Sequence, residues 1–568
     1  MDRMIDCPTC GVFRRDRFID ERLPPRDAWP DLSPEKAGLA VPPRMNAAAM
    51  LLAGATSPDR YGRAALIGEY ETWSYGRLAE TVDAVAHVLI RDLGLTPGGR
   101  VLLRGPNTPW LAACWLAVVK AGGVVVSTMP LLRGAELAPL LRKTKPVAAL
   151  CDIRFAEELE SAMRLDCHPM RVAYFDGGRS VGGGERGRLR PGGLEAMAAR
   201  YAAPFAAVDC SPEDVALICF TSGATGTPKA AAHFHRDLIA VADLSPRHIL
   251  QSRADDVFCG SPSLAFAYGL GGLLLFPLRV GATAALVERG APEKLLHVIV
   301  NHGATILFAV PTAYRSLTAL ARRLELPKET FARLRLCISA GEPLLTATAE
   351  AWREVSGKTI LDSLGTTEML NAVLHARPGA VKPGAVGQAA PGYEVRVVDT
   401  DMNDLPPGEV GRLAVRGPTG CRYVADERQA AYVRQGWNLT GDAGWLDEEG
   451  YFHHHGRTDD LIVSGGYKLS GVEVEDVLLR HPAVAECAVV AGPDQLRGAA
   501  PYAFVVVQEG MAEDEELARE LQDFVREKLA PFKYPRVVVF TDVLPRTETG
   551  KIQRYRLREK AREVPGAD

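Results

Sequence analysis

A loop rich in hydroxyl groups and glycine directly follows an apolar run in the first half of the chain. It reads TSGATGTPK at residues 221–229, after the segment ALICF. Backbone N–H groups, hydroxyls and a lysine in so short a stretch can surround phosphate groups. The loop is not a Walker A loop, because Pro228 precedes Lys229 and Ala230 follows it, where that motif needs Gly and then Ser or Thr. The sequence therefore predicts a phosphate-binding loop of another kind, with an ordinary Gly/Ser turn as the alternative.

Three further segments combine charged and hydroxyl side chains with glycine. They are SLGTTEML at 363–370, LTGDAGWLDEEGYFHHHGRTDD at 439–460 and LPRTETGKIQR at 544–554. Together with the loop at 221–229, and in this order, they resemble the adenylate-forming superfamily of acyl-CoA synthetases, aryl-CoA ligases, luciferases and peptide-synthetase adenylation domains. The resemblance covers nearly the whole chain. It implies an acid–thiol ligase of the AMP-forming type, which uses ATP to make an acyl-adenylate and passes the acyl group to a thiol such as coenzyme A.

Such a reaction brings the negative charges of a carboxylate and a triphosphate together, so the site needs cations and preorganised donors. Lys229 and Lys551 can supply positive charge. By resemblance, Lys551 contacts the reacting carboxylate and the α-phosphate, and Thr367 donates a hydrogen bond to the α-phosphate. Glu368 is similar to the residue that holds Mg²⁺ against the triphosphate, and one carboxylate plus phosphate oxygens is an arrangement that suits this ion.

The nucleotide site implied by the resemblance is spread over the same motifs. Asp442 resembles the carboxylate that accepts hydrogen bonds from the ribose hydroxyls, with Arg457 nearby. Leu364 stands where the family usually has an aromatic platform for adenine, so adenine is expected to lie on an aliphatic side chain. The expected ATP-binding residues are Thr221, Ser222, Gly223, Thr225, Gly226, Lys229, Gly341, Glu342, Pro343, Asp362, Leu364, Thr367, Asp442 and Arg457.

The choice of acid is expected from FIDERLPPRDAWPDL near the N-terminus, AFAYGLGG at 265–272 and SAGEPLL at 339–345. These segments most resemble benzoate- and 2-aminobenzoate-CoA ligases. The implied acid pocket consists of Phe266, Ala267, Tyr268, Ala340, Gly341, Gly365 and Asn371. Small residues leave a flat slot, and an aromatic wall can stack on an aryl ring.

Asn371 departs from the benzoate-type pattern, which commonly has His at this position. Asn both donates and accepts hydrogen bonds, which favours an aryl acid with an ortho-amino or ortho-hydroxy group. We expect 2-aminobenzoate (anthranilate) as the acid and free coenzyme A as the acceptor. Benzoate or salicylate as the acid, and a carrier-protein thiol as the acceptor, remain alternatives.

The elements that position these motifs follow the rhythm of an α/β protein. Residues 73–92 have apolar side chains at helical spacing, and the apolar strand VLLR follows at 101–104. The same order recurs in WLAACWLAVVKAGGVVVSTMP and LLRKTKPVAALCD, which indicates a large domain with parallel-rich sheets flanked by helices. After residue 456 the pattern changes to a small α+β unit.

We therefore expect an ATP- and acid-binding domain at residues 1–456, a hinge at 457–460 and a mobile C-terminal domain at 461–568. Asp459 is the expected pivot, because it matches the hinge position of the family's GRxDD pattern. The rotation would bring Lys551 to the acid and ATP, and would then remove it to admit the thiol.

Composition restricts the remaining functional classes. The chain has 568 residues, of which 47% are hydrophobic and 24% charged, with a net charge of -4, so no global bias toward nucleic acid or an acidic membrane is present. No apolar run approaches the roughly 18 residues of a membrane span, and residues 1–18 lack a signal-peptide core. The expected compartment is the cytoplasm, and the expected partners are a small aromatic carboxylic acid, ATP and coenzyme A, with a separate downstream acyltransferase or carrier protein.

Two clusters could suggest a metal. Cys7-x-x-Cys10 lacks a second ligand pair nearby, so a mobile leader is favoured over a metal or redox site. His453, His454 and His455 are consecutive, and consecutive strand residues point to alternate faces, so the three cannot all reach one ion. The 11 cysteines form no obvious disulfide framework, and their odd number suits a reducing compartment.

Overall fold

The computed structural model describes residues 4–7, 11–176, 192–221, 228–288, 290–458, 460–464, 467–494, 497–530, 533–546 and 551–564. For 4–7, 11–13, 36, 467 and 468 it describes the backbone alone. Ser222, Gly223, Thr225, Gly226, Asp459 and Cys10 lie outside the described residues, as does most of the Gly- and Arg-rich stretch at 176–193.

The first large sheet contains the predicted apolar strands of the N-terminal half. Its order is β10-β9-β6-β5-β7-β8, parallel except for β10, which runs antiparallel to β9. The strands are β5 (Arg100–Arg104), β6 (Val124–Thr128), β7 (Ala148–Asp152), β8 (Arg171–Phe175), β9 (Val215–Thr221) and β10 (Lys229–Phe234). Helices α5 (Gly134–Thr144) and α6 (Ala156–Asp166) pack on one face. Strands β9 and β10 flank the predicted phosphate loop, and Thr221 pairs with Lys229 at its two ends.

The second large sheet has nine strands, in the order β17-β16-β15-β14-β13-β11-β12-β3-β4. Its central strands are parallel, and β16, β17 and β4 join antiparallel at the edges. The strands are β3 (Ala64–Ile67), β4 (Thr72–Ser74), β11 (Val257–Gly260), β12 (Thr283–Leu286), β13 (Ile306–Ala309), β14 (Leu336–Ser339), β15 (Ile360–Thr366), β16 (Asn371–His375) and β17 (Gln388–Ala389). Helices α11 (Pro292–Asn301), α12 (Pro311–Arg323) and α13 (Thr346–Ser356) cover one face.

The main hydrophobic core lies between the two sheets. Helix α4 (Pro109–Lys120) packs on the first sheet, α3 (Tyr75–His87) packs on the second, and the two helices pack on each other. Thr108 caps α4 by accepting from the Leu111 amide, and Pro109 suits the first helical position. Because α4 is enclosed on nearly every side, almost all of its side chains are apolar. The other short helices of this domain are α1 (Ala47–Leu51), α2 (Pro58–Tyr61), α7 (Leu194–Ala198), α8 (His235–Leu244), α9 (Ala267–Leu270), α10 (Phe276–Val280) and α14 (Gln429–Tyr432).

A smaller antiparallel sheet connects the large sheets to the C-terminal part. It contains β18 (Glu394–Val398), β19 (Gly411–Arg416), β20 (Val433–Arg434), β21 (Trp437–Leu446) and β22 (Phe452–Arg457). Strands β21 and β22 hold Asp442 opposite Arg457. Residues 437–457 thus form a hairpin, which explains how two charged residues 15 positions apart reach the same place.

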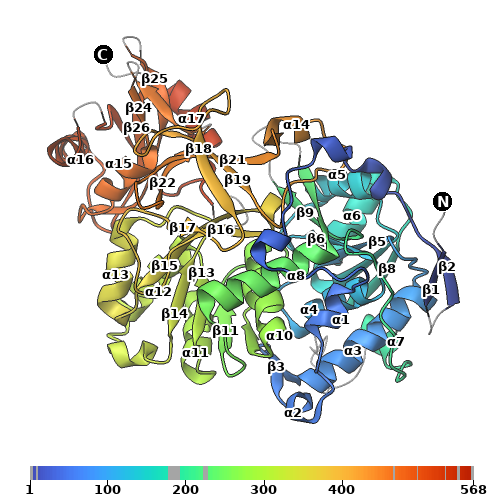
Figure 1. The fold of residues 1–568 in the computed structure, drawn as a ribbon. Coiled ribbons are helices and arrows are strands. Elements are labelled where there is room, and N and C mark those ends of the chain that lie inside the picture. The colour runs from blue at the N-terminus through green and yellow to red at the C-terminus, as the bar shows by residue number, and fades with distance from the viewer. Residues whose placement is uncertain are drawn as a thin grey trace.

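The C-terminal domain has a hydrophobic core of its own, formed by residues between 462 and 540. Its strands are β23 (Ile462–Ser464), β24 (Tyr467–Leu469), β25 (Val484–Asp494), β26 (Gly498–Val507) and β27 (Val537–Phe540). Its helices are α15 (Gly471–Leu478), α16 (Glu515–Lys528) and α17 (Arg554–Glu563). Figure 1 shows these orange and red elements grouped at one end, away from the hairpin β1 (Met4–Cys7) and β2 (Gly11–Arg14).

The predicted α/β class, with a large N-terminal domain and a small α+β C-terminal domain, is therefore confirmed. Within the part of the chain that the structure describes, no helix combines the length and hydropathy needed to cross a bilayer.

Candidate active site

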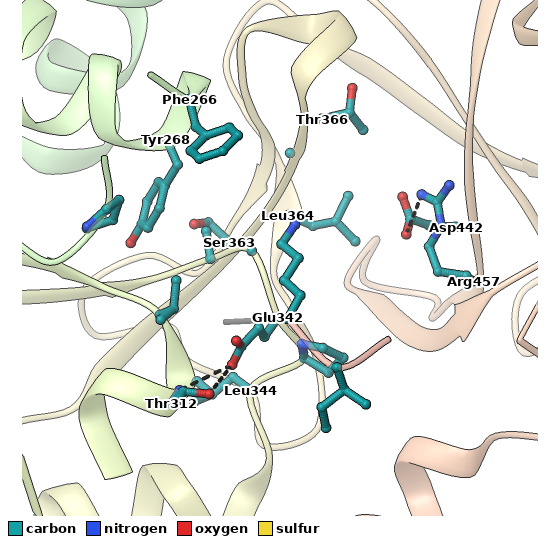
Figure 2. Close-up of a pocket in the computed structure, with 18 of the residues that line it drawn as sticks. Phe266, Tyr268, Thr312, Glu342, Leu344, Ser363, Leu364, Thr366, Asp442 and Arg457 are labelled. Carbon is teal, nitrogen blue, oxygen red and sulfur yellow. Dashed lines mark hydrogen bonds and ion pairs between the residues drawn. The ribbon is translucent and has the colours of Figure 1, made fainter. Parts of the chain in front are cut away.

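A cavity of about 2750 Å³ lies where the two large sheets, the antiparallel sheet and the C-terminal domain meet. Every sequence-predicted site residue that the structure describes lines it. These residues are Thr221, Lys229, Phe266, Ala267, Tyr268, Ala340, Gly341, Glu342, Pro343, Asp362, Leu364, Gly365, Thr367, Glu368, Asn371, Asp442, Arg457 and Lys551. Figure 2 shows aromatic residues on one side, Asp442 and Arg457 on the other, and the β15 segment between them.

Lys551 enters the cavity from the C-terminal domain. A Cβ built on Gly341 would lie 3.8 Å from the Lys551 Cε, which places the lysine beside this residue, and the φ of +90° at Gly341 is a backbone conformation that favours glycine. Lys551 is exposed to solvent within the cavity, and desolvation by the surrounding groups lowers its pKa more than the nearby carboxylate of Glu342 raises it. Glu342 in turn accepts from the Thr312 hydroxyl at 2.8 Å and from its amide at 3.2 Å (Figure 2).

The loop that carries Lys551 is fixed by Arg554. This guanidinium pairs with the buried carboxylate of Glu475 on α15, with one contact at 2.8 Å, and also donates to the Val489 carbonyl at 3.0 Å. The C-terminal domain also contacts helix α13 of the large domain, because the Ala347 amide at the start of α13 donates to Asp476 at 3.2 Å. Sequence reasoning had assigned no role to Arg554, although it lies within the TGKIQR motif.

Glu368 and Lys229 form the charged end of the cavity together with Asp442 and Arg457. Glu368 lies on the short helix η9 (Thr367–Met369), which Thr366 caps by accepting from the Met369 amide at 3.2 Å. The Lys229 Nζ lies 3.9 Å from the Glu368 Oε1, and the Tyr423 hydroxyl donates to the same oxygen.

Asp442 is buried and has two cationic or donor neighbours. Both the Arg457 Nη1 and the His454 Nε2 lie 3.4 Å from its Oδ1. Burial alone would raise the pKa of Asp442, but the hydrogen bond from His454 and the charge of Arg457 outweigh it, so the pKa lies below its ordinary value. The carboxylate is therefore ionised at neutral pH and suited to accept hydrogen bonds from hydroxyl groups.

The aromatic end of the cavity consists of Phe266, Tyr268, Ser245 and Asn371. The Tyr268 hydroxyl donates to the Ile338 carbonyl at 3.0 Å, which holds its ring against the β13–β14 edge. The Asn371 Nδ2 donates to the Ser245 Oγ at 2.6 Å. The aromatic end thus combines two aromatic rings with the hydrogen-bonded polar pair of Asn371 and Ser245.

Glycine is needed at position 365 for a reason other than the flat acid slot that the sequence suggested. A Cβ there would come within 2.3 Å of the Asn371 carbonyl oxygen and 2.6 Å of the Ala372 Cα. The close pairing of β15 with β16 therefore requires this glycine, whatever the shape of the pocket.

Several lining residues were missed by sequence reasoning. Ser245 begins the π-helical turn η6 (Ser245–Leu250), and no local signal places it beside Asn371, 126 positions later. Other unpredicted members of the lining are Leu250, Phe276, Phe308, Ser363 and His375. They come from separate elements, so only the fold brings them together.

Asp362 lies at the base of the cavity. Burial raises its pKa well above the ordinary range, and its Oδ1 is a buried acceptor without a hydrogen-bond partner among the described residues. Such an acceptor is costly unless a ligand donates to it. The position thus fits an amino group of a bound molecule.

For metals, the described residues contain no cluster of three or more His, Cys, Asp or Glu that could hold an ion. Glu368 offers one carboxylate, and Mg²⁺ is commonly bound by one or two carboxylates together with substrate phosphates. The residue therefore fits this ion only jointly with a phosphate ligand. His453 stacks on Trp445 at 3.8 Å between ring centroids, whereas the neighbouring His454 faces Asp442.

Comparison with known proteins gives the same picture over nearly the whole chain. The family model described as AMP-binding enzyme matches residues 55–423, and the model of its C-terminal domain matches residues 473–551. A benzoate–CoA ligase of Thauera aromatica is 36% identical over 93% of this chain and 98% of its own length.

Two solved structures are also similar. One is the anthranilate CoA ligase AuaEII in complex with anthranoyl-AMP, with a TM-score of 0.84 and 31% identity over 93% of this chain and 98% of that one. The other is a benzoate CoA ligase from Burkholderia xenovorans LB400, with a TM-score of 0.81 and 33% identity over 90% of this chain and 100% of that one. The resemblance drawn from the four motifs is confirmed: the chain belongs to the AMP-binding enzyme family and is an acid–thiol ligase of the AMP-forming type.

Proposed function

We propose that the chain is an aryl acid:CoA ligase that activates an aromatic carboxylate, with 2-aminobenzoate as its substrate. One observation carries the proposal: Lys551 lies beside Gly341, in a cavity that has the aromatic end on one side and Asp442 on the other. An aryl acid in the aromatic end and a nucleotide at Asp442 would meet near this lysine. The similarity to benzoate and anthranilate CoA ligases supports the same assignment.

In the first half-reaction, a carboxylate oxygen of the acid attacks the α-phosphorus of ATP. The bond from that phosphorus to the pyrophosphate oxygen breaks, and pyrophosphate leaves with the electron pair. Lys551 and Thr367 stabilise the charge that develops on the α-phosphate, and Lys229 holds the outer phosphates. Glu368 would hold Mg²⁺ there, and the bound ion supplies charge neutralisation for the triphosphate.

In the second half-reaction, the thiolate of coenzyme A attacks the carbonyl carbon of the acyl-adenylate. The bond from this carbon to the phosphate oxygen breaks, and AMP leaves. We propose that residues 461–568 rotate about Asp459 between the two steps, because Lys551 occupies the region that a bulky thiol must enter. The domain limits 1–456 and 461–568 belong to this proposal.

We assign the ribose and adenine positions from the charge of Asp442 and from the buried acceptor of Asp362. Asp442 would accept from the ribose hydroxyls, with Arg457 beside it, and adenine would lie against Leu364 near the turn at 341–343. The buried Oδ1 of Asp362 would accept from the adenine amino group, which would give this acceptor its missing partner.

The ortho-amino preference rests on the Asn371–Ser245 pair. Its two side chains place a donor and an acceptor in an otherwise apolar wall, and a pocket with such groups favours a ligand that completes their hydrogen bonds. Plain benzoate would leave part of this capacity unused.

A panel of acids tests the proposal through coenzyme A-dependent release of AMP. We expect 2-aminobenzoate to give the highest kcat/KM, ahead of benzoate and salicylate, with acetate and palmitate far behind. A preference for palmitate would contradict the aryl assignment. AMP release that needs a carrier-protein thiol and ignores free coenzyme A would show that the chain loads a carrier instead.

A further inference from the structure

Tyr423 lies beneath the charged end of the cavity, and no sequence motif pointed to it. Its side chain is 1% exposed. The backbone around it pairs with β10, because the Ala232 amide donates to the Arg422 carbonyl and the Val424 amide to the Ala230 carbonyl, both at 2.9 Å. Since β10 begins at Lys229, the strand that carries this lysine is joined directly to the segment that carries Tyr423.

The hydroxyl and the ring of Tyr423 contact two different charged groups. The hydroxyl donates to the Oε1 of Glu368, a residue that is 6% exposed. The Lys229 Nζ lies 4.9 Å from the centroid of the Tyr423 ring, within the range of a cation–π contact. The same Nζ is 3.9 Å from Oε1, which is longer than a hydrogen bond, so the ammonium is held beside the carboxylate without being hydrogen-bonded to it.

A second tyrosine completes the support. The Tyr432 ring lies 5.6 Å from that of Tyr423, at an interplanar angle of 72°, and 5.8 Å from the Lys229 Nζ. Its hydroxyl is 3.1 Å from the Thr366 Oγ1, the atom that caps the helix of Glu368. Both rings therefore lie within cation–π range of Lys229. The Tyr423 hydroxyl contacts Glu368, and the Tyr432 hydroxyl contacts Thr366, the residue that caps the helix of Glu368.

Hydrogen bonds also fix the backbone of Tyr423. The Gln429 Oε1 accepts from the Tyr423 amide at 2.9 Å, and the Gln429 Nε2 donates to the Ala28 carbonyl at 2.8 Å. A hydroxyl anchored in this way can select one carboxylate orientation, because a buried hydrogen bond to an ionised group is strong and directional.

We propose that Tyr423 is a positioning residue that holds Glu368 and Lys229 in the arrangement that binds a magnesium–triphosphate complex. With Oε1 engaged by the phenol, Oε2 is the oxygen presented to the cation, and Lys229 keeps its donors for the phosphates. The inference rests on the proposed use of ATP, but not on the identity of the acid.

The test is calorimetric titration of the full chain with ATP, with and without Mg²⁺, in the absence of any acid. For the unchanged chain, we expect Mg²⁺ to strengthen ATP binding. In Tyr423→Phe the ring remains and the hydroxyl is lost, so most of this strengthening should disappear, with a weakening of about tenfold in Mg²⁺ and little change without it. Tyr75→Phe is the matched control, because it removes a buried phenol that donates to the Ala282 carbonyl at 2.7 Å, far from the site.

A second set of variants separates a positioning role from general destabilisation. If Tyr423 acts through Glu368, then Tyr423→Phe should add almost nothing to Glu368→Gln in a double-mutant cycle of Mg²⁺-dependent ATP affinity. Tyr423→Leu also removes the ring, so it should weaken ATP binding even without Mg²⁺, through Lys229.

The outcomes are distinct. Additive effects of Tyr423→Phe and Glu368→Gln, or an unchanged Mg²⁺ response in Tyr423→Phe, would overturn the inference while leaving the ligase assignment intact. A Mg²⁺ response lost equally in Tyr75→Phe would identify the effect as structural and overturn it too. If the unchanged chain bound no ATP, the proposed function would fail and the inference with it.

Discussion

The charged end and the aromatic end of the cavity are constructed in different ways. At the charged end, Lys229, Glu368 and Asp442 are each held by contacts from several elements, including the phenol of Tyr423 and the imidazole of His454. At the aromatic end, the polar contacts include those of the Tyr268 hydroxyl and of the Asn371–Ser245 pair, beside the rings of Phe266 and Tyr268.

The difference follows from what each end has to bind. A triphosphate places the same charges in the same positions in every reaction of this type, so its site can be rigid and fully specified. An acid differs from one enzyme to the next, and a wall of packed side chains can change without affecting the phosphate chemistry. Substitutions at the charged end should therefore reduce activity with all acids, whereas those at the aromatic end should change their order.

The largest effect is expected from Lys551→Ala. It should slow adenylation by about a thousandfold with every acid, because it removes the cation at the developing charge. Transfer from a preformed 2-aminobenzoyl-adenylate to coenzyme A should stay close to the unchanged rate. Pyrophosphate exchange measures the first step, and thioester formation from the synthetic adenylate measures the second. Lys528→Ala, on the exposed side of α16, is the control, and equal loss of both steps would contradict the assignment.

Asp459→Pro tests whether the C-terminal domain, which carries Lys551, rotates about this residue between the two half-reactions. Proline fixes φ and removes an N–H, so the hinge should favour one orientation, and one half-reaction should fall by about a hundredfold more than the other. The same two assays report this ratio. Two half-reactions at the unchanged rates would place the pivot elsewhere in the chain.

Asp442→Asn removes the charge but keeps the shape. The KM for ATP should rise by about tenfold or more, as expected for weakened hydrogen bonds to a charged group. The order of preference among aryl acids should not change, because Asp442 lies away from the aromatic end (Figure 2). A changed order would show that the two ends are coupled.

Sequence reasoning named residues at both ends of the cavity, and at both ends it missed side chains that contact them. Lys229, Glu368, Asp442 and Lys551 stand in motifs whose residue types state their chemistry, and all four line the cavity. Tyr423 and Arg554 could not be assigned in the same way, because each acts through a second residue that only the fold brings near it.

At the aromatic end, prediction from the sequence failed for a similar reason. Asn371 stands next to a motif, but its partner Ser245 follows helix α8, 126 positions earlier in the chain, so only the fold brings the two together. The apolar strands and the change of pattern after residue 456 could be predicted, since burial on both faces dictates uninterrupted apolar runs. The antiparallel sheet β18–β22 was missed, because its strands alternate only weakly between buried and exposed positions.

Asn371→Leu should sharpen the comparison from the aromatic end. It removes the paired polar group, so the preference for 2-aminobenzoate over benzoate should fall by about tenfold in kcat/KM. The KM for ATP should stay unchanged, because the charged end is intact. Ser245→Ala removes only the partner and should produce a smaller change in the same direction. An unaltered preference in both variants would mean that the pair does not read the ortho group.

The smallest effect at neutral pH is expected from His454→Phe. His454 is one of three groups that keep the pKa of Asp442 low against the opposing effect of burial, and Arg457 and Thr440 remain in the variant. At pH 7 Asp442 should therefore stay ionised, and ATP affinity should fall by only about twofold, since a long contact of this kind contributes little.

At lower pH the variant should differ more from the unchanged chain. A carboxylate whose pKa is depressed by folding contributes stability above its unfolded pKa and loses it as the pH falls through the folded pKa. Without the hydrogen bond from His454, the folded pKa rises, so both ATP affinity and stability should be lost at a higher pH than in the unchanged chain. Titration with ATP at a series of acidic pH values measures the pH at which ATP affinity is lost in each variant. His453→Phe is the control, because that imidazole stacks on Trp445 and contacts Asp447, not Asp442. If the two variants shifted the acid limb equally, the low pKa of Asp442 would have to come from Arg457 and Thr440 without His454.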